Sequence, residues 1–208
     1  KDFVEVVNRD LEEAGPFAVI KNGLPHTTDP ASFKAWADTG TEWLVVTALS
    51  RRGEDRLEVS LKVLDVRSGK PVFTKPYSGP NAALRRIAHS VADELVAHLT
   101  GEPGVASTRV VFVRQTAPEG IKEIFQVDRD GSSIVQLTRH GSLTISPSVA
   151  PDGRLAYVTY KGGTPEIWGQ RSIGGPHVKL YPAGAKVEGH CFSPAWSPDG
   201  KRLAFVQG

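Results

Sequence analysis

Hydrophobic residues in the first half of the chain recur at two spacings, one typical of helices and one typical of strands. A spacing of three to four residues predicts three helices, over residues 3–14, 29–40 and 81–99. Asp29 is suited to cap the second helix, because Pro30 follows it at the first helical position. Gly15-Pro16 and Gly101 end the first and third helices, since glycine accepts a left-handed cap and proline cannot continue a helix.

Alternating apolar residues between the second and third helices predict a small sheet. Leu57, Val59, Leu61 and Val63 alternate strictly with polar residues, which is typical of a strand with one buried face. Its predicted neighbours are strands over 43–50 and 71–77, and a short strand is also expected over 17–20. Residues 1–104 are therefore predicted to form an α+β domain, with helices on one face of a small mixed sheet.

The second half contains an internal repeat. Residues 147–158 recur as residues 194–206, and their Asp-Gly pairs lie 47 residues apart; residues 109–113 are a third copy of the strand after the turn. Two more strands are predicted between successive copies, over 123–128 and 134–138, then over 166–170 and 178–181. A period in the forties with four short strands per unit is the signature of a β-propeller blade.

Counting the predicted strands gives an incomplete propeller over residues 105–208. From the inside outward, one whole blade has strands over 147–150, 155–159, 166–170 and 178–181, with three strands before this blade and two after it. About two and a quarter blades cannot close a ring, so a fragment of a longer protein is expected rather than several chains that pool blades. The sequence contains no methionine, so Lys1 is not expected to be the natural start.

Composition excludes several classes of function. A formal net charge of +2 without a clustered basic stripe argues against nucleic-acid binding. No apolar run approaches the roughly 20 residues of a membrane-spanning helix. Cys191 is the single cysteine, so neither a disulfide within the chain nor a cysteine-rich metal site is expected; a buried apolar environment is expected for it.

Candidate catalytic and metal-binding groups are better explained as structural. The acidic pairs Glu12-Glu13 and Asp93-Glu94, together with His89, fall on or beside polar helix faces, which is typical of a solvated surface. Asp128 and Asp130 precede Gly131 as in a calcium loop, but further acidic ligands are missing, so a hairpin turn is predicted. Asp152 and Asp199 are expected to accept backbone N–H bonds in Pro-Asp-Gly turns. No catalytic, cofactor-binding or metal-binding residue is predicted.

The combination of these features over the whole chain resembles the TolB family, the periplasmic component of the Tol-Pal system. The residues that carry the resemblance are Leu99-Thr100-Gly101 and Gly104 after the helix, Thr108-Arg109-Val110 at the start of the propeller, and the repeat over residues 193–205. The resemblance implies a six-bladed propeller, export by an upstream signal peptide, and no catalysis. It also implies roles in outer-membrane integrity, cell division and colicin import.

Two partners follow from the resemblance. Proteins of this family bind the peptidoglycan-associated lipoprotein Pal at one mouth of the propeller channel, and TolA through an N-terminal segment expected upstream of Lys1. Loops that enter the innermost strands open on the channel mouth, so residues 143–146 and 189–193 are the expected contact region. The residues predicted to contact Pal are His190, Phe192, Ser193, Thr144 and Ser146. A solvated turn is an equally good interpretation of His190.

Two other functions remain open at this stage. The propeller could be accessory to a prolyl-oligopeptidase-like serine hydrolase, which needs a Gly-x-Ser-x-Gly nucleophile elbow; this pentapeptide is absent from the sequence. It could also bind small ligands such as sugars, for which no specific motif is visible.

Overall fold

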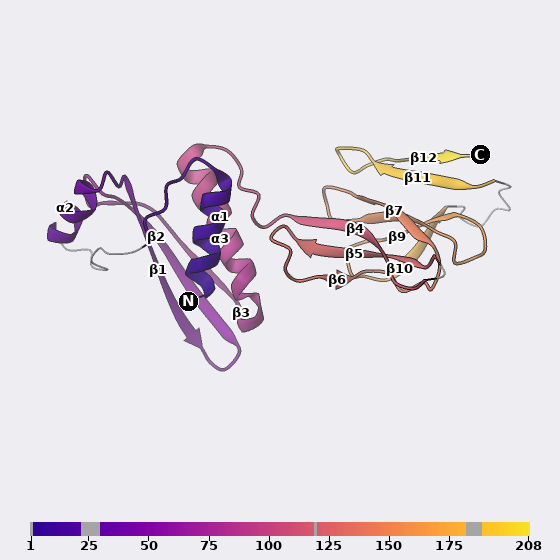
Figure 1. Cartoon of the computed structure of the whole chain (residues 1–208), viewed down its shortest axis with the longest axis horizontal. Helices are drawn as coiled ribbons and strands as arrows, with labels where there is room; N and C mark the ends of the chain where they lie inside the picture. The colour runs from indigo at the N-terminus through magenta and orange to yellow at the C-terminus, as the bar shows by residue number, and fades with distance from the viewer. Residues whose placement is uncertain (1, 22–29, 119, 182–188) are drawn as a thin grey trace. The chain divides into compact units, whose positions relative to one another are not determined.

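The computed structural model describes residues 2–21, 30–118, 120–181 and 189–208 (Figure 1). They form two compact units that divide between Ser107 and Thr108, three residues after the predicted boundary at Gly104. The helix N-cap expected at Asp29 lies outside the described residues.

The first unit packs two helices on one face of a three-stranded antiparallel sheet. Helices α1 (Asp2–Ala14) and α3 (Leu84–Thr100) lie side by side (Figure 1), and a 3₁₀ turn, η1 (Asn81–Ala83), leads into α3. The sheet order is β1 (Trp43–Arg52), β2 (Arg56–Asp65), β3 (Pro71–Pro80). The alternating residues of β2 are buried under the helices, as their spacing predicts. A shorter helix, α2 (Pro30–Asp38), precedes β1.

Two predictions for this unit are wrong. Residues 17–20 form no strand, and of these four residues only Phe17 and Val19 pack against the core. The described sheet is consequently antiparallel throughout rather than mixed. His89 is not solvated either, because its ring is 2% exposed and its Nδ1 lies 2.5 Å from Oδ2 of the equally buried Asp10. This pair joins α1 to α3 inside the core.

Asp93 explains why the first unit extends to Ser107. Its two carboxylate oxygens accept the backbone N–H groups of Ala106 at 2.6 Å and Ser107 at 2.9 Å. A Cβ at Gly104 would lie 2.3 Å from the Asp93 Cα, so only glycine allows the chain to pass this close to α3. The segment after α3 is therefore held against its own unit, and Asp93 serves a structural purpose on the helix.

The described residues of the second unit form three antiparallel sheets with three, four and two strands, as predicted. The first has the order β4 (Arg109–Gln115), β5 (Lys122–Asp128), β6 (Val135–Gln136). The complete blade has the order β7 (Thr144–Val149), β8 (Leu155–Thr159), β9 (Glu166–Gln170), β10 (His177–Tyr181). The last is the hairpin of β11 (Cys191–Trp196) and β12 (Leu203–Gln207).

Strand β6 is shorter than the predicted strand over 134–138. The Thr138 hydroxyl turns inward and donates to the buried Glu123 carboxylate at 2.5 Å, while it accepts the Ile124 N–H at 2.8 Å. The backbone N–H groups of Leu137 and Thr138 both point at the Ile124 carbonyl. Leu137 and Thr138 therefore do not continue the pairing of β6 with β5, because Thr138 bonds to Glu123 instead.

The repeated Pro-Asp-Gly turns carry the predicted local hydrogen bonds. Asp152 accepts the N–H of Arg154 at 3.2 Å, and Asp199 accepts the N–H of Lys201 at 3.0 Å. Hydrogen bonds from Arg154 hold the pKa of the Asp152 carboxyl below its usual range. The Asp128 carbonyl accepts the Gly131 N–H at 2.8 Å, which confirms a hairpin turn there as well.

Arg154 also connects two successive repeats. Its guanidinium pairs with Asp152, lies 4.4 Å from the ring centroid of Trp196 on β11, and donates to the Gly200 carbonyl in the next Pro-Asp-Gly turn. A second connection joins the same two repeats, because the backbone N–H of Trp196 donates to the Ser148 hydroxyl on β7 at 3.0 Å. These contacts fix the hairpin of β11 and β12 beside the complete blade.

We expect Arg154→Ala to lower the free energy of unfolding of the second unit by about 1–2 kcal/mol, because it removes a cation–π contact and a hydrogen bond between repeats. Arg202 precedes the equivalent leucine of the next repeat and is exposed, so Arg202→Ala is the matched control, with an expected change within about 0.5 kcal/mol. Denaturant unfolding of both variants measures the difference. Equal effects would contradict the assigned connection.

Candidate partner-binding site

The innermost strands of successive blades share a distorted residue at the same place. The pairing of β7 with β8 shifts between Ile145 and Ser148, and that of β11 with β12 shifts between Phe192 and Ala195. Within these bulges Ser146 has φ 54° and Ser193 has φ 51°. A left-handed backbone costs a residue with a side chain about 1–2 kcal/mol. Two serines therefore hold the same unfavourable conformation, each directly before a proline.

Both serines lie inside strands, although they were expected in the loops that enter them. Strand β7 begins at Thr144 and β11 at Cys191, so each strand includes the bulge. Ser193 is exposed and Ser146 is half-buried. Bulges redirect side chains and are frequent next to binding sites. Ser146 and Ser193 therefore remain candidates for contact with a partner.

His190 and Phe192 form an aromatic pair beside the second bulge. The His190 backbone exchanges hydrogen bonds with Gly208, at 2.7 Å and 3.0 Å, and so extends the hairpin by one residue. Its imidazole is exposed and its ring centroid lies 6.0 Å from that of the half-buried Phe192. The pair offers a partner both apolar surface and a polar tip.

Thr144 has a different position from the other predicted contact residues. It is 0% exposed, and its hydroxyl lies 3.1 Å from that of Thr159 on the neighbouring strand β8. Its side chain therefore stabilises the blade interior and is not available on the surface. The bulge explains the difference, since it begins between Thr144 and Ser146 and interrupts the alternation that would place both side chains on one face.

Cys191 lies next to His190 but is buried, as expected. Burial raises the pKa of its thiol, so the neutral form is favoured at neutral pH. In the described ranges, no three His, Cys, Asp or Glu side chains come together as a metal-binding group. None of the helices that the structure describes is long and apolar enough to cross a membrane.

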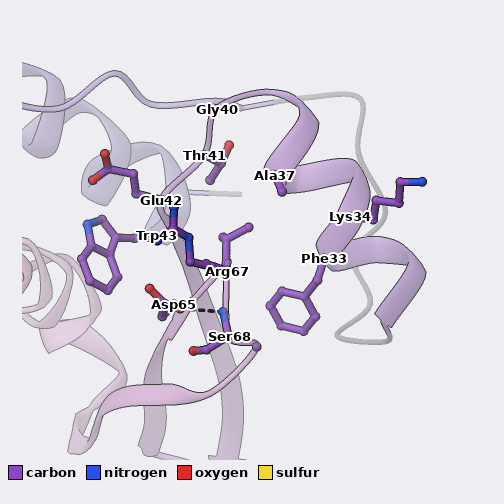
Figure 2. Close-up of a pocket in the computed structure, with 12 residues that line it drawn as sticks. Phe33, Lys34, Ala37, Gly40, Thr41, Glu42, Trp43, Asp65, Arg67 and Ser68 are labelled. Atoms are coloured by element: carbon purple, nitrogen blue, oxygen red, sulfur yellow. Dashed lines mark hydrogen bonds between the residues drawn. The ribbon is translucent and has the colours of Figure 1, made fainter.

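The first unit has an open groove of about 1030 Å³ that sequence reasoning did not find. Figure 2 shows Phe33 and Ala37 of α2 facing the turn that contains Asp65, Arg67 and Ser68. Hydrogen bonds from the Ser68 side chain and from its backbone N–H, the latter at 2.6 Å, lower the pKa of the Asp65 carboxyl. Phe33 is half-buried and lines the groove, whereas Trp36 on the same helix is buried.

Comparison with known proteins identifies the family. A model of the TolB amino-terminal domain matches residues 1–72, and a model of the TolB beta propeller domain matches residues 96–208. The chain belongs to the TolB family. The TolB fold thus accounts for both units and for the repeat on which the propeller was predicted.

Individual relatives agree with this assignment. The Tol-Pal system protein TolB of Anaeromyxobacter dehalogenans strain 2CP-C is 36% identical over 97% of this chain and 46% of its own length. That of Anaeromyxobacter sp. strain K is 35% identical over the same shares. The crystal structure of TolB from Acinetobacter baumannii has the same fold, with a TM-score of 0.79, 24% identity, and coverage of 99% of this chain and 52% of that one. The chain spans about half the length of the TolB relatives it matches.

We expect Ser146→Gly and Ser193→Gly each to raise the free energy of unfolding of the second unit by about 0.5 kcal/mol, because relief of the left-handed strain outweighs the added freedom of the unfolded chain. Ser172, on an exposed turn with ordinary φ, supplies the control: Ser172→Gly should lower stability slightly. Denaturant titration of the three variants measures these changes in the free energy of unfolding. A loss of stability at all three positions would show that the bulges are unstrained.

Proposed function

We propose that this chain is part of a non-catalytic periplasmic adaptor of the Tol-Pal system, which binds the peptidoglycan-associated lipoprotein Pal through its propeller. The observation that carries the proposal is the repeated bulge of β7 and β11, which sets Ser146 and Ser193 at equivalent places in successive blades. Strained backbone that persists in two repeats is typical of positions kept for binding. Membership of the TolB family agrees with this function.

His190, Phe192 and Ser193 form the centre of the proposed contact. The half-buried phenyl ring lies on β11 with the bulge, and the exposed imidazole belongs to the residue just before this strand, so one surface combines an aromatic anchor with polar groups. Aromatic residues in this arrangement supply much of the binding energy in protein interfaces. Ser146 extends the surface onto the preceding blade. Thr144 contributes indirectly, because its bond to Thr159 holds the start of β7.

The first unit is proposed to couple this adaptor to TolA, together with a segment N-terminal to the residues of this chain. The first unit and the linker as far as Ser107 form one compact body. The Asp93 hydrogen bonds to Ala106 and Ser107 hold the linker against α3. An adaptor that transmits a binding event from one partner to the other needs the linker that leaves its first unit to have a fixed position. Support for outer-membrane integrity and cell division follows from this coupling.

The binding test uses the full-length protein and the soluble domain of Pal. We expect His190→Ala and Phe192→Ala each to weaken binding by about tenfold or more in titration calorimetry, since each removes a central aromatic group. The change in thermal stability should be small for His190→Ala, because the imidazole is exposed. His98→Ala is the matched control, since His98 is an exposed histidine of the first unit.

Three outcomes distinguish an error in the proposed binding site from an error in the proposed function. Unchanged affinity in both His190→Ala and Phe192→Ala would remove this strand from the site while Pal binding itself stood. Equal weakening in His98→Ala would point to a general effect of removing a histidine. Absence of binding by the unaltered full-length protein would reject the proposed function.

A further inference from the structure

Three side chains from different parts of the second unit meet at one hydroxyl group. The Nε2 atom of His140, which follows β6, lies 2.9 Å from the Tyr157 hydroxyl on β8. The Nδ1 atom of His177, the first residue of β10, lies 2.7 Å from the same hydroxyl. The centroids of the two imidazole rings are 4.9 Å apart, and the ring planes meet at 66°. This cluster connects the segment between two blades to the outermost strand of the complete blade.

The surroundings of the cluster are mostly buried. Tyr157 is 0% exposed, and both histidines are half-buried. The ring of Trp168 on β9 lies 5.8 Å from that of His140. The amide of Gln170, also on β9, donates to the Gly175 carbonyl at 2.9 Å and reaches the His177 ring only at 3.4 Å.

Two charged groups act on the histidines from the neighbouring elements. Glu123 on β5 is buried and accepts hydrogen bonds from the Thr138 hydroxyl and the Gly141 N–H, at 2.5 Å and 2.7 Å. Lys161, in the turn after β8, lies 5.3 Å from the Trp168 ring centroid. Glu123 favours the charged form of both histidines and Lys161 opposes it.

The hydrogen-bonding groups of the cluster limit how many added protons it can bind. When both histidines are neutral, one imidazole N–H donates to the Tyr157 oxygen and the hydroxyl donates to the bare nitrogen of the other imidazole. One added proton can be accommodated, because the tyrosine hydroxyl can turn toward whichever histidine stays neutral. A second proton leaves the hydroxyl without an acceptor and places two imidazolium rings beside each other. Both consequences are unfavourable in a buried site.

We propose that His140, Tyr157 and His177 form a pH-sensitive hydrogen-bonded cluster. At neutral pH this cluster holds β10 and the inter-blade segment, residues 139–142, to β8, and it releases both as the pH falls. Strand β10 has one neighbour in its sheet, β9, and its pairing with β9 is interrupted between Lys179 and Tyr181. Loss of the His177 contact therefore loosens the end of β10 at which pairing begins.

The direction of the pH dependence follows from the environment of the two rings. Burial lowers the pKa of both His140 and His177, and the mutual proximity of the rings lowers that of His140 further. A histidine with a lowered pKa in the folded state stabilises that state when it is neutral. The contribution is therefore complete above the ordinary histidine pKa of about 6.5 and is lost as the pH falls through the lowered value.

Hydrogen exchange of the 208-residue chain at pH 7.5 and pH 5.0, corrected for the intrinsic exchange rate, tests the proposal. We expect protection of the amides of β10 and of residues 139–142 to fall by about tenfold or more at the lower pH, with β2 unchanged. The double variant His140→Gln/His177→Gln should abolish this dependence, because glutamine does not titrate. His98→Gln, which alters an exposed histidine of the first unit, should retain it.

Tyr157→Phe keeps the ring and removes only the shared hydroxyl. In this variant we expect reduced protection of β10 already at pH 7.5, together with a smaller pH dependence than in the unaltered chain. Retention of the full pH dependence by the double histidine variant would overturn the proposal. Equal protection of β10 in the unaltered chain at both pH values would overturn it as well.

Discussion

Strand β8 is buried along its whole length, and the organisation of the second unit depends on that constraint. Leu155 and Tyr157 pack with Ile124 and Leu137 of the preceding sheet, whereas the small Ala156 points to the opposite face, where β11 lies close. A strand buried on both faces needs a sheet on each side. One blade alone cannot provide a sheet on each side of β8, so neighbouring blades must stack. Stacking brings the ends of their innermost strands to the same edge.

The elements with local causes could be predicted from sequence. The Asp152 and Asp199 turns form because an aspartate bonds to the backbone two residues later, which depends only on adjacent residues. The alternation of β2 and the Gly101 cap of α3 are local in the same sense, and the structure confirms both. Because the turn recurs at a fixed distance, the repeat and the strand numbers of the three sheets followed from it. The resemblance to the TolB family rested in addition on Leu99-Thr100-Gly101 and the residues that follow it.

Features that depend on register or on distant partners could not be predicted. The burial of Thr144 follows from its pairing with Thr159, and the burial of His89 follows from Asp10, which is 79 residues away in the sequence. The strand assigned to residues 17–20 has strand-like alternation but no partner within the described residues. The cluster at Tyr157 brings together side chains from three segments. Nothing in the neighbouring sequence of any one of them indicates the other two.

Mapping of the complex tests most directly the proposal that the inner strands with the strained serines form the partner-binding surface. Hydrogen exchange of the full-length protein with and without the soluble domain of Pal should show added protection over residues 189–193 and 143–146, with the groove around Phe33 unchanged. Added protection at that groove, with none at either inner strand, would contradict the account.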